Sequence, residues 1–224
     1  IENLFSAWEE LKHGKGTRSD VLEFEMDLEP NIFKLHRELK EVTYRHGPYS
    51  GFFITDPKRR HVHKASVRDR ILHHSVFGIL YPIFEPTFIS ASFSCQIGKG
   101  SHRGVEMVSK MLRKESRNSS RPCYALKCDI QKFFDNIDHN ILVNLLERRI
   151  GDKRVMTLLR ELVGSYADET EFRRESSGAS SRRGMPIGNL TSQLFANVYM
   201  NEFDNFVDLV LEKRIHWDKC NEIF

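Results

Sequence analysis

The segment "YALKCDIQKFFD" (124–135) places an aspartate directly after a short apolar run, and two phenylalanines follow it closely. The carboxylate of Asp129 and the backbone carbonyl of Ile130 are hard oxygen donors, which Mg²⁺ prefers. Two such ions held about 4 Å apart can stabilise the attacking and leaving oxygens of a phosphoryl transfer. An aspartate after an apolar run is also common as a turn or capping residue, so this feature alone does not define a site.

The elements around Asp129 determine whether it can act as a ligand. Alternation over residues 124–130 predicts a core strand that ends near Asp129. Asp138 is placed to cap a helix that Gly151 would end. The basic segment 173–184 is predicted to be a loop. Glycine and proline in 184–189 then predict a turn, and the apolar spacing that follows predicts a long helix reaching residue 211.

The first half of the chain alternates helical and extended patterns. A helix is predicted over 29–42, and a glycine-punctuated loop at 95–104 precedes another helix over 105–114. Residues 46–65 predict two short strands joined at Asp56-Pro57, and Ser66 is placed to cap the helix that follows. This mixture predicts an α+β fold that is helix-rich with a small antiparallel sheet.

Composition indicates an ordinary globular chain, because 40% of the residues are hydrophobic and 29% are charged. Basic residues cluster in 56–70 and again in 99–121. Such local patches attract phosphate groups more strongly than the net charge of +3 suggests. A solvated charged surface is the alternative interpretation of both patches.

Cysteine usage and hydropathy bear on the compartment. The four cysteines are scattered without a CxxC spacing, which argues against a zinc site or a disulfide framework and favours a reducing, cytoplasmic location. The richest apolar run, 76–84, is broken by Pro82 and is far shorter than the ~18 residues of a membrane span. We therefore expect no membrane partner.

Four segments in order resemble conserved blocks of reverse transcriptases. Residues 126–142 ("LKCDIQKFFDNIDHNIL") resemble the first catalytic block, and 184–204 ("GMPIGNLTSQLFANVYMNEFD") resemble the next block of the palm. Upstream, 44–74 and 92–108 are similar to the two fingers blocks that precede the palm. The order and spacing of the four blocks carry the resemblance more than any single block does.

The resemblance implies a right-hand polymerase fold. Residues 1–42 would form a helical lead and 43–122 the fingers. Residues 123–224 would form a partial palm, with a helical insertion at 138–183. The implied reaction is RNA-directed DNA synthesis, with an RNA template, a DNA or RNA primer, deoxynucleotide triphosphates and two Mg²⁺ ions. An accessory protein of the retroelement is a further possible partner.

Residue roles also follow from the resemblance. Asp129, with the Ile130 carbonyl, would bind the metal ions, and Phe134 would stack under the deoxyribose and reject a 2′-hydroxyl. The remaining implied contacts lie on the fingers and on the nucleotide side of the palm. The residues implied to bind the nucleotide are Lys58, Arg60, Arg70, Pro186, Ile187, Gly188 and Gln193, and those implied to bind nucleic acid are Lys99, His102 and Arg103. The alternatives are a core aromatic for Phe134, a surface basic face for Lys58 and Arg60, and a helix salt bridge for Arg70.

One departure suggests a subgroup. Many reverse transcriptases have a glutamine before the glycine of this turn and a Ser-Pro pair after it, but here Ile187 and Gln193 occupy the glutamine and proline positions. This pattern resembles the error-prone enzymes of diversity-generating retroelements. An apolar residue in place of an amide removes a hydrogen bond that helps to reject wrong pairs. The alternative is that Ile187 is a packed turn residue.

A second departure concerns the remaining carboxylates. Reverse transcriptases carry a Tyr-x-Asp-Asp hairpin after the long helix, whereas here Asp218 and Glu222 are the late carboxylates and they are not adjacent. We therefore expect residues 1–224 alone to be inactive, and the start at Ile1 suggests a fragment. A truncated sequence, a frameshift and a genuinely short protein are the explanations left open.

Two other functions compete with that of a reverse transcriptase. A non-catalytic RNA-binding remnant would use the same basic fingers and aromatic residues without needing Asp129. An RNA-copying RNA polymerase would be expected to carry a smaller or polar residue in place of Phe134. The histidines His61, His63, His73 and His74 lack neighbouring ligands at metal spacing, so we expect core or RNA-contacting roles for them.

Overall fold

The structure is a computed structural model that describes residues 1–55, 58–125, 127–166 and 182–208. Its elements are helices and one pair of strands, which confirms the helix-rich α+β prediction. The chain divides into two compact units, residues 1–83 with 132–199 and residues 84–131 with 200–224. Both units are discontinuous in sequence, so the expected limits of the fingers and palm stay predictions.

The first unit begins with three helices, α1 (Glu2–Lys12), α2 (Ser19–Met26) and α3 (Leu28–Lys40). In α1 the buried residues recur at helical spacing, so one face packs inward: Leu4, Ala7, Trp8 and Leu11. Trp8 packs on Phe24 of α2, with 5.5 Å between ring centroids. The predicted helix over 29–42 is confirmed as α3, although Phe33 is 51% exposed.

The strands β1 (Ser50–Thr55) and β2 (Arg59–Lys64) form the predicted antiparallel hairpin, with Phe53 opposite His61 and Ser50 opposite Lys64. The predicted turn at Asp56-Pro57 lies outside the described residues. Helix α4 (Val67–Phe84) follows, and Ser66 accepts a hydrogen bond from the Asp69 N–H at 3.1 Å, which confirms its capping role. Ile79 of this helix is 55% exposed although it is apolar.

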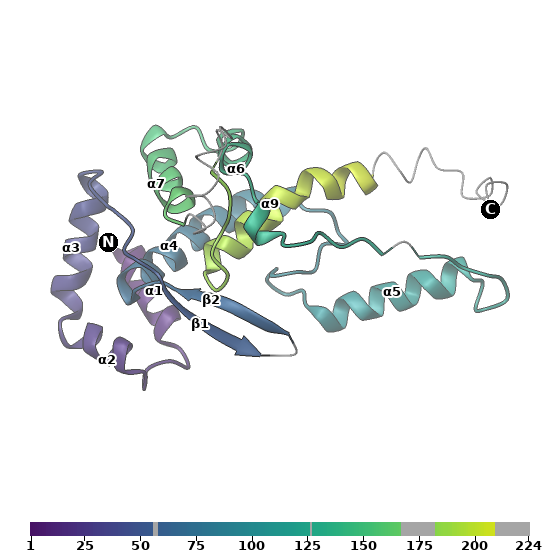
Figure 1. The fold of residues 1–224 in the computed structure, drawn as a ribbon, viewed down its shortest axis with the longest axis horizontal. Coiled ribbons are helices and arrows are strands. Elements are labelled where there is room, and N and C mark those ends of the chain that lie inside the picture. The colour runs from purple at the N-terminus through teal and green to yellow at the C-terminus, as the bar shows by residue number, and fades with distance from the viewer. Residues whose placement is uncertain (56–57, 126, 167–181, 209–224) are drawn as a thin grey trace. The chain divides into compact units, whose positions relative to one another are not determined.

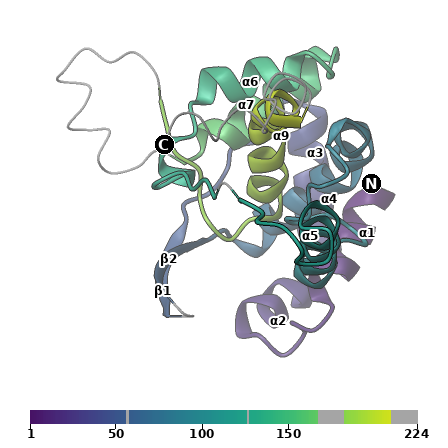
Figure 2. The same ribbon diagram turned by 90° about the vertical axis from the view of Figure 1, so that its right-hand side faces the viewer.

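Helices α6 (His139–Glu147) and α7 (Lys153–Gly164) lie side by side in Figures 1 and 2. Each helix buries one face, on which leucines recur at helical spacing. Arg160 of α7 forms an ion pair with Glu147 of α6. The prediction that Gly151 ends α6 is wrong: the helix ends at Glu147, and Gly151 lies in the connection before Asp152 caps α7. The predicted long helix after the turn is confirmed as α9 (Leu190–Phe206), which buries Leu194, Phe195 and Val198.

The second unit contains helix α5 (Ser101–Glu115), the short helix η1 (Glu85–Thr87) and the end of α9. Helix α5 is longer than the predicted 105–114. Two apolar residues of the predicted long helix, Phe203 and Phe206, are 47% and 50% exposed, and Val210 of the same helix lies outside the described residues. No helix in the described part of the chain is long and apolar enough to span a membrane.

Candidate functional site

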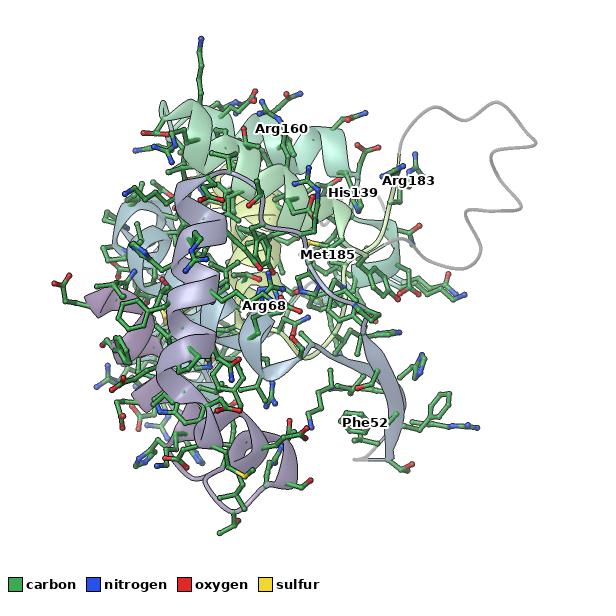
Figure 3. The ribbon with its side chains drawn as sticks, turned by 90° about the vertical axis from the view of Figure 1, so that its left-hand side faces the viewer. Phe52, Arg68, His139, Arg160, Arg183 and Met185 are labelled. Atoms are coloured by element: carbon green, nitrogen blue, oxygen red, sulfur yellow. The ribbon has the colours of Figure 1, made fainter. Side chains whose placement is uncertain are left out.

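Phe134 begins a short 3-10 helix (η2, Phe134–Asn136) that is hydrogen-bonded to a segment about fifty positions later in the chain. The Met185 N–H donates to the Phe134 carbonyl at 2.8 Å, and the Gly184 N–H donates to the Ile137 carbonyl at 2.9 Å. In the other direction, the His139 N–H donates to the Arg182 carbonyl at 3.0 Å. Figure 3 shows His139, Arg183 and Met185 in this region. These bonds fix Phe134 beside the start of the 185–189 turn.

Side chains reinforce this pairing. The buried His139 ring donates from Nε2 to the Gly184 carbonyl at 2.7 Å, since a carbonyl can only accept. Asp138 accepts from the Asn140 and Ile141 N–H groups at 3.0 and 3.2 Å, which confirms its predicted role as the cap of α6. Its other oxygen lies 3.7 Å from Arg183. Most of the loop predicted at 173–184 lies outside the described residues.

The 185–189 turn docks on the hairpin. The Ile187 carbonyl accepts a hydrogen bond from the His63 N–H of β2 at 2.9 Å. Gly188 has φ +121°, and a Cβ there would lie 2.8 Å from Cγ1 of Val62. The lack of a side chain at Gly188 thus allows a close approach of the turn to β2. The nucleotide contact implied for this glycine stays a prediction.

The predicted nucleotide residues of the turn are therefore brought together with Phe134. Pro186 is buried, Ile187 is half-buried and Gly188 is exposed. Gln193 is half-buried in the first turn of α9, which the 185–189 turn leads into. Phe134 itself is half-buried and packs edge-on against Phe133, with 5.5 Å between ring centroids. The backbone of Phe134 is thus bonded to the start of a glycine turn, and contact of its ring with a nucleotide stays a prediction.

The hairpin presents aromatic and cationic groups. Lys58 and Arg60 are exposed, as expected for residues that meet phosphates. Arg59, which the sequence reasoning did not single out, lies over the Phe53 ring at 4.0 Å. Phe53 in turn stacks on His61 with 4.5 Å between centroids. In Figure 3, Phe52 lies on the same hairpin, and it is 45% exposed.

Arg70 differs from the other fingers cations. Its guanidinium forms an ion pair with Asp20 of α2, and its side chain is only 12% exposed. Lys64 of β2 contacts the same carboxylate at 2.8 Å. Burial acts to raise the pKa of Asp20, but its hydrogen bonds and charge interactions with Lys64 and Arg70 outweigh this and hold the pKa below its usual value. This geometry favours the salt-bridge alternative for Arg70.

Asp129 and Ile130 belong to the second unit. The prediction of a core strand over 124–130 is wrong for the described residues of that segment, which form no strand and are exposed, with Tyr124 at 83% and Ile130 at 49%. A strand is held by backbone hydrogen bonds to a neighbouring strand. No described segment of the second unit pairs with these residues.

The fit of Mg²⁺ to these residues can be judged from their donors. Asp129 offers the right donor type, but among residues 1–55, 58–125, 127–166 and 182–208 no three acidic, histidine or cysteine side chains gather as a metal-binding group. Asp218 and Glu222 lie outside the described residues. The described residues therefore do not form a complete magnesium site.

The second basic zone is only partly available to a ligand. Lys99 donates to the Ser90 carbonyl at 3.3 Å and lies 5.9 Å from the Phe93 ring centroid. His102 and Arg103 are exposed in the first turn of α5. Their proposed contact with nucleic acid is compatible with this exposure.

A buried polar network was missed from the sequence. Asp69 is fully buried and accepts from the Tyr44 hydroxyl at 2.8 Å, the Ser66 hydroxyl at 2.7 Å and the Gly47 N–H at 3.1 Å. Arg68, labelled in Figure 3, also contacts it at 3.2 Å and lies over the Tyr44 ring. Burial, then the Asp69 charge, raises the pKa of Tyr44 well above its usual range. The signal available in the sequence was an aspartate three residues after the capping Ser66.

His73 belongs to a second buried chain of hydrogen bonds. Its Nε2 lies 3.2 Å from Nε2 of His46, and its Nδ1 lies 2.7 Å from the Thr191 hydroxyl. Burial, together with the nearby His46, lowers the pKa of His73 to about 3, so the ring is neutral at physiological pH. The expectation of a core role for His73 agrees with its burial.

Comparison with known proteins defines the class. The family model described as "Reverse transcriptase (RNA-dependent DNA polymerase)" matches residues 55–217, nearly three quarters of the chain. The chain belongs to the reverse transcriptase family. The matched region includes Asp129, Phe134 and the 185–189 turn.

Named relatives are about a quarter identical to this chain over the residues that align. Protein YkfC of Escherichia coli (strain K12) is 27% identical over 195 residues, which cover 86% of this chain and 49% of YkfC. The group II intron-encoded protein LtrA of Lactococcus lactis subsp. cremoris is also 27% identical, over 85% of this chain and 30% of LtrA. The chain thus spans half or less of the length of these relatives. Among solved structures, a chain of a partial Cas6-RT-Cas1–Cas2 complex is 20% identical, covers 93% of this chain and 34% of that chain, and has a TM-score of 0.47.

Proposed function

We propose that the protein containing these residues copies an RNA template into DNA from a primer 3′-hydroxyl. The observation that carries the proposal is the hydrogen-bonded pairing of the Phe134 segment with the 185–189 turn, inside the region that matches the reverse transcriptase family. This pairing holds the backbone of Phe134 against the start of the turn, and in the proposal its half-buried ring stacks under the deoxyribose. Lys58 and Arg60 supply exposed cations on the hairpin against which the same turn docks.

Asp129 is the proposed metal ligand of this reaction, with Ile130 contributing its carbonyl. One carboxylate cannot hold two Mg²⁺ ions, so the proposal requires further carboxylates from outside the described residues. When bound, the metal ions would activate the primer hydroxyl and stabilise the leaving pyrophosphate. The template and primer are the proposed partners, and an accessory protein of the retroelement is a further proposal.

The test is primer extension on an RNA template by the full-length protein, comparing the wild type with Asp129→Asn. Loss of a metal-binding carboxylate is expected to reduce the rate by at least about a thousandfold, equivalent to ~4 kcal/mol. RNA binding, measured on the same preparations, should change by less than about twofold, because Asp129 is exposed and removing its charge leaves the basic surfaces intact.

The non-catalytic alternative predicts a different pattern. A remnant that only holds RNA would show no metal-dependent extension in the wild type and the same RNA affinity in both proteins. Extension that survives Asp129→Asn would contradict the assigned role of this carboxylate.

The proposal of a particular subgroup of reverse transcriptases rests on the side chain of Ile187. We propose error-prone synthesis of the kind expected of a diversity-generating retroelement, because an aliphatic side chain in the turn cannot donate a hydrogen bond to the base or sugar. The relation to LtrA supports a second candidate, the protein of a group II intron.

Substitution at this turn separates the two candidates. Ile187→Gln is expected to lower the misincorporation frequency by about fivefold, the value of one added hydrogen bond of ~1 kcal/mol. Sequencing of complementary DNA made by the two proteins measures this. A wild type that already copies accurately, with no gain in the variant, would favour the intron-protein candidate.

A further inference from the structure

A series of hydrogen bonds connects helix α4 to the end of the 185–189 turn. Thr191 is only 1% exposed and lies in the first turn of α9, directly after the turn. Its hydroxyl lies 2.7 Å from Nδ1 of His73. His73 is itself 3% exposed, and its Nε2 lies 3.2 Å from Nε2 of His46. The ring of His73 thus joins α4 to Thr191, which lies more than a hundred positions later in the sequence.

With both rings neutral, the Gly47 carbonyl fixes the direction of each hydrogen bond in the series that runs through His46 and His73 to Thr191. Nδ1 of His46 lies 2.6 Å from the Gly47 carbonyl, which can only accept, so this nitrogen carries the proton. Nε2 of His46 is then an acceptor, and Nε2 of His73 must donate to it. Nδ1 of His73 is left as an acceptor, and the Thr191 hydroxyl donates to it.

The same segment is held from a second side by β2. The His63 N–H donates to the Ile187 carbonyl at 2.9 Å, and Gly188 lies against Val62. The turn is therefore fixed at its middle by β2 and at its end by His73. The bond at Thr191 is buried, so its loss would leave a ring nitrogen or a hydroxyl without a partner in a place that water does not reach.

We propose that His73 is a positioning residue for the nucleotide site, acting through Thr191 to hold the 185–189 turn in place. His73 lies behind the turn and contacts its following helix, and it takes no part in the chemistry. The inference rests on the proposed function for its effect on nucleotide use, but its structural part stands independently.

Three substitutions of His73 test its two ring nitrogens separately, and a fourth removes the Thr191 hydroxyl. The side-chain amide in His73→Asn reaches the place of Nδ1, so it can still accept from Thr191. The longer amide in His73→Gln reaches the place of Nε2, so it keeps the His46 contact and loses Thr191. His73→Phe keeps the ring volume and removes both nitrogens, and Thr191→Val removes the hydroxyl at nearly constant shape.

The direct readout is hydrogen exchange of the His63 amide in the full-length protein, because that N–H is bonded to the turn itself. We expect exchange to accelerate about tenfold in His73→Gln, His73→Phe and Thr191→Val, and to stay within about threefold of wild type in His73→Asn. The double variant His73→Gln with Thr191→Val should be no faster than either single variant, because both remove the same bond.

Primer extension on the same proteins gives the functional readout. The variants that lose the Thr191 contact are expected to raise KM for deoxynucleotides about tenfold with kcat nearly unchanged, and His73→Asn is expected to restore KM. Equal exchange rates in all three His73 variants, or protection kept by His73→Gln and lost by His73→Asn, would overturn the proposal. If the wild type makes no DNA, the proposed function fails, while the exchange of the His63 amide still decides whether His73 positions the turn.

Discussion

Gly188 shows how a single residue fixes the candidate site. Its φ of +121° falls in a region that side chains disfavour, and the space where a Cβ would lie is filled by Val62 at 2.8 Å. Glycine permits both the backbone conformation and the contact with β2. The position of Ile187, its neighbour, depends on this contact, because the Ile187 carbonyl bonds to the same strand.

Gly188→Ala is therefore expected to destabilise the protein by about 2 to 4 kcal/mol, from backbone strain and from the clash with Val62. Urea unfolding of the two proteins measures the difference. Gly14→Ala is the matched control, since Gly14 also has a positive φ, +67°, but nothing lies within 4 Å of its Cβ position. The control should cost about 1 to 2 kcal/mol. Equal losses in both variants would show that the contact with β2 contributes nothing.

At the scale of elements, the hairpin depends on its neighbours. All six residues of β1 are exposed, and an isolated two-stranded hairpin is marginally stable in water. The bond between His63 and Ile187 and the ion pair of Lys64 with Asp20 attach β2 to the rest of the first unit. The hairpin is thus held at β2, while Phe53, Lys58 and Arg60 are exposed.

The start of α4 is a second such attachment. Asp69 joins the segment from Tyr44 to Gly47 to the first turn of the helix, and its carboxylate is satisfied by three neutral donors and by Arg68. Removing the carboxylate would leave several of these groups buried without an acceptor.

Asp69→Ala is expected to lower the free energy of unfolding by about 3 to 5 kcal/mol, as when one partner of a buried ion pair is removed. Asp152→Ala is the control, because Asp152 only caps α7 at the surface, through the Arg154 and Val155 N–H groups at 2.7 and 3.0 Å. Loss of that cap should cost about 1 kcal/mol. Chemical denaturation at neutral pH compares the two, and a loss in Asp69→Ala no larger than in the control would contradict the account.

At the scale of the whole molecule, local patterns predicted most of the elements and distant pairings were missed. Helical spacing identified α3, α6 and α9, and the alternating segment identified the hairpin, because each pattern is contained in a few consecutive residues. The strand expected at 124–130 did not form, because a strand also needs a partner that its own residues do not specify. Phe203 and Phe206 fit the apolar spacing of α9 but are exposed, because spacing does not specify what packs against a helix.

Residues of the candidate site were likewise predicted where a local motif marks them and missed where their partners are distant in sequence. Phe134, Pro186 and Gly188 were found from motifs, and the structure links their segments directly. His73, Asp69 and Thr191 were not assigned to the site, since a histidine or threonine within a helix carries no local sign of its distant partner. Arg70 has the residue type expected of a phosphate ligand, yet the nearby Asp20 engages it.

Phe134 and the 185–189 turn are proposed to form a site that selects deoxynucleotides for RNA-templated synthesis. The most direct measurement is the ratio of kcat/KM for a deoxynucleotide to that for its ribonucleotide, in the wild type, Phe134→Val and Phe133→Val. Phe133 is the matched control, because it is adjacent, is also half-buried, and packs against Phe134 and Tyr199 with 5.5 and 6.3 Å between ring centroids. The account predicts that Phe134→Val lowers this ratio at least about tenfold, ~1.4 kcal/mol of lost discrimination, and that Phe133→Val leaves it nearly unchanged. A ratio that is unchanged in Phe134→Val, or lowered equally in both variants, would contradict it.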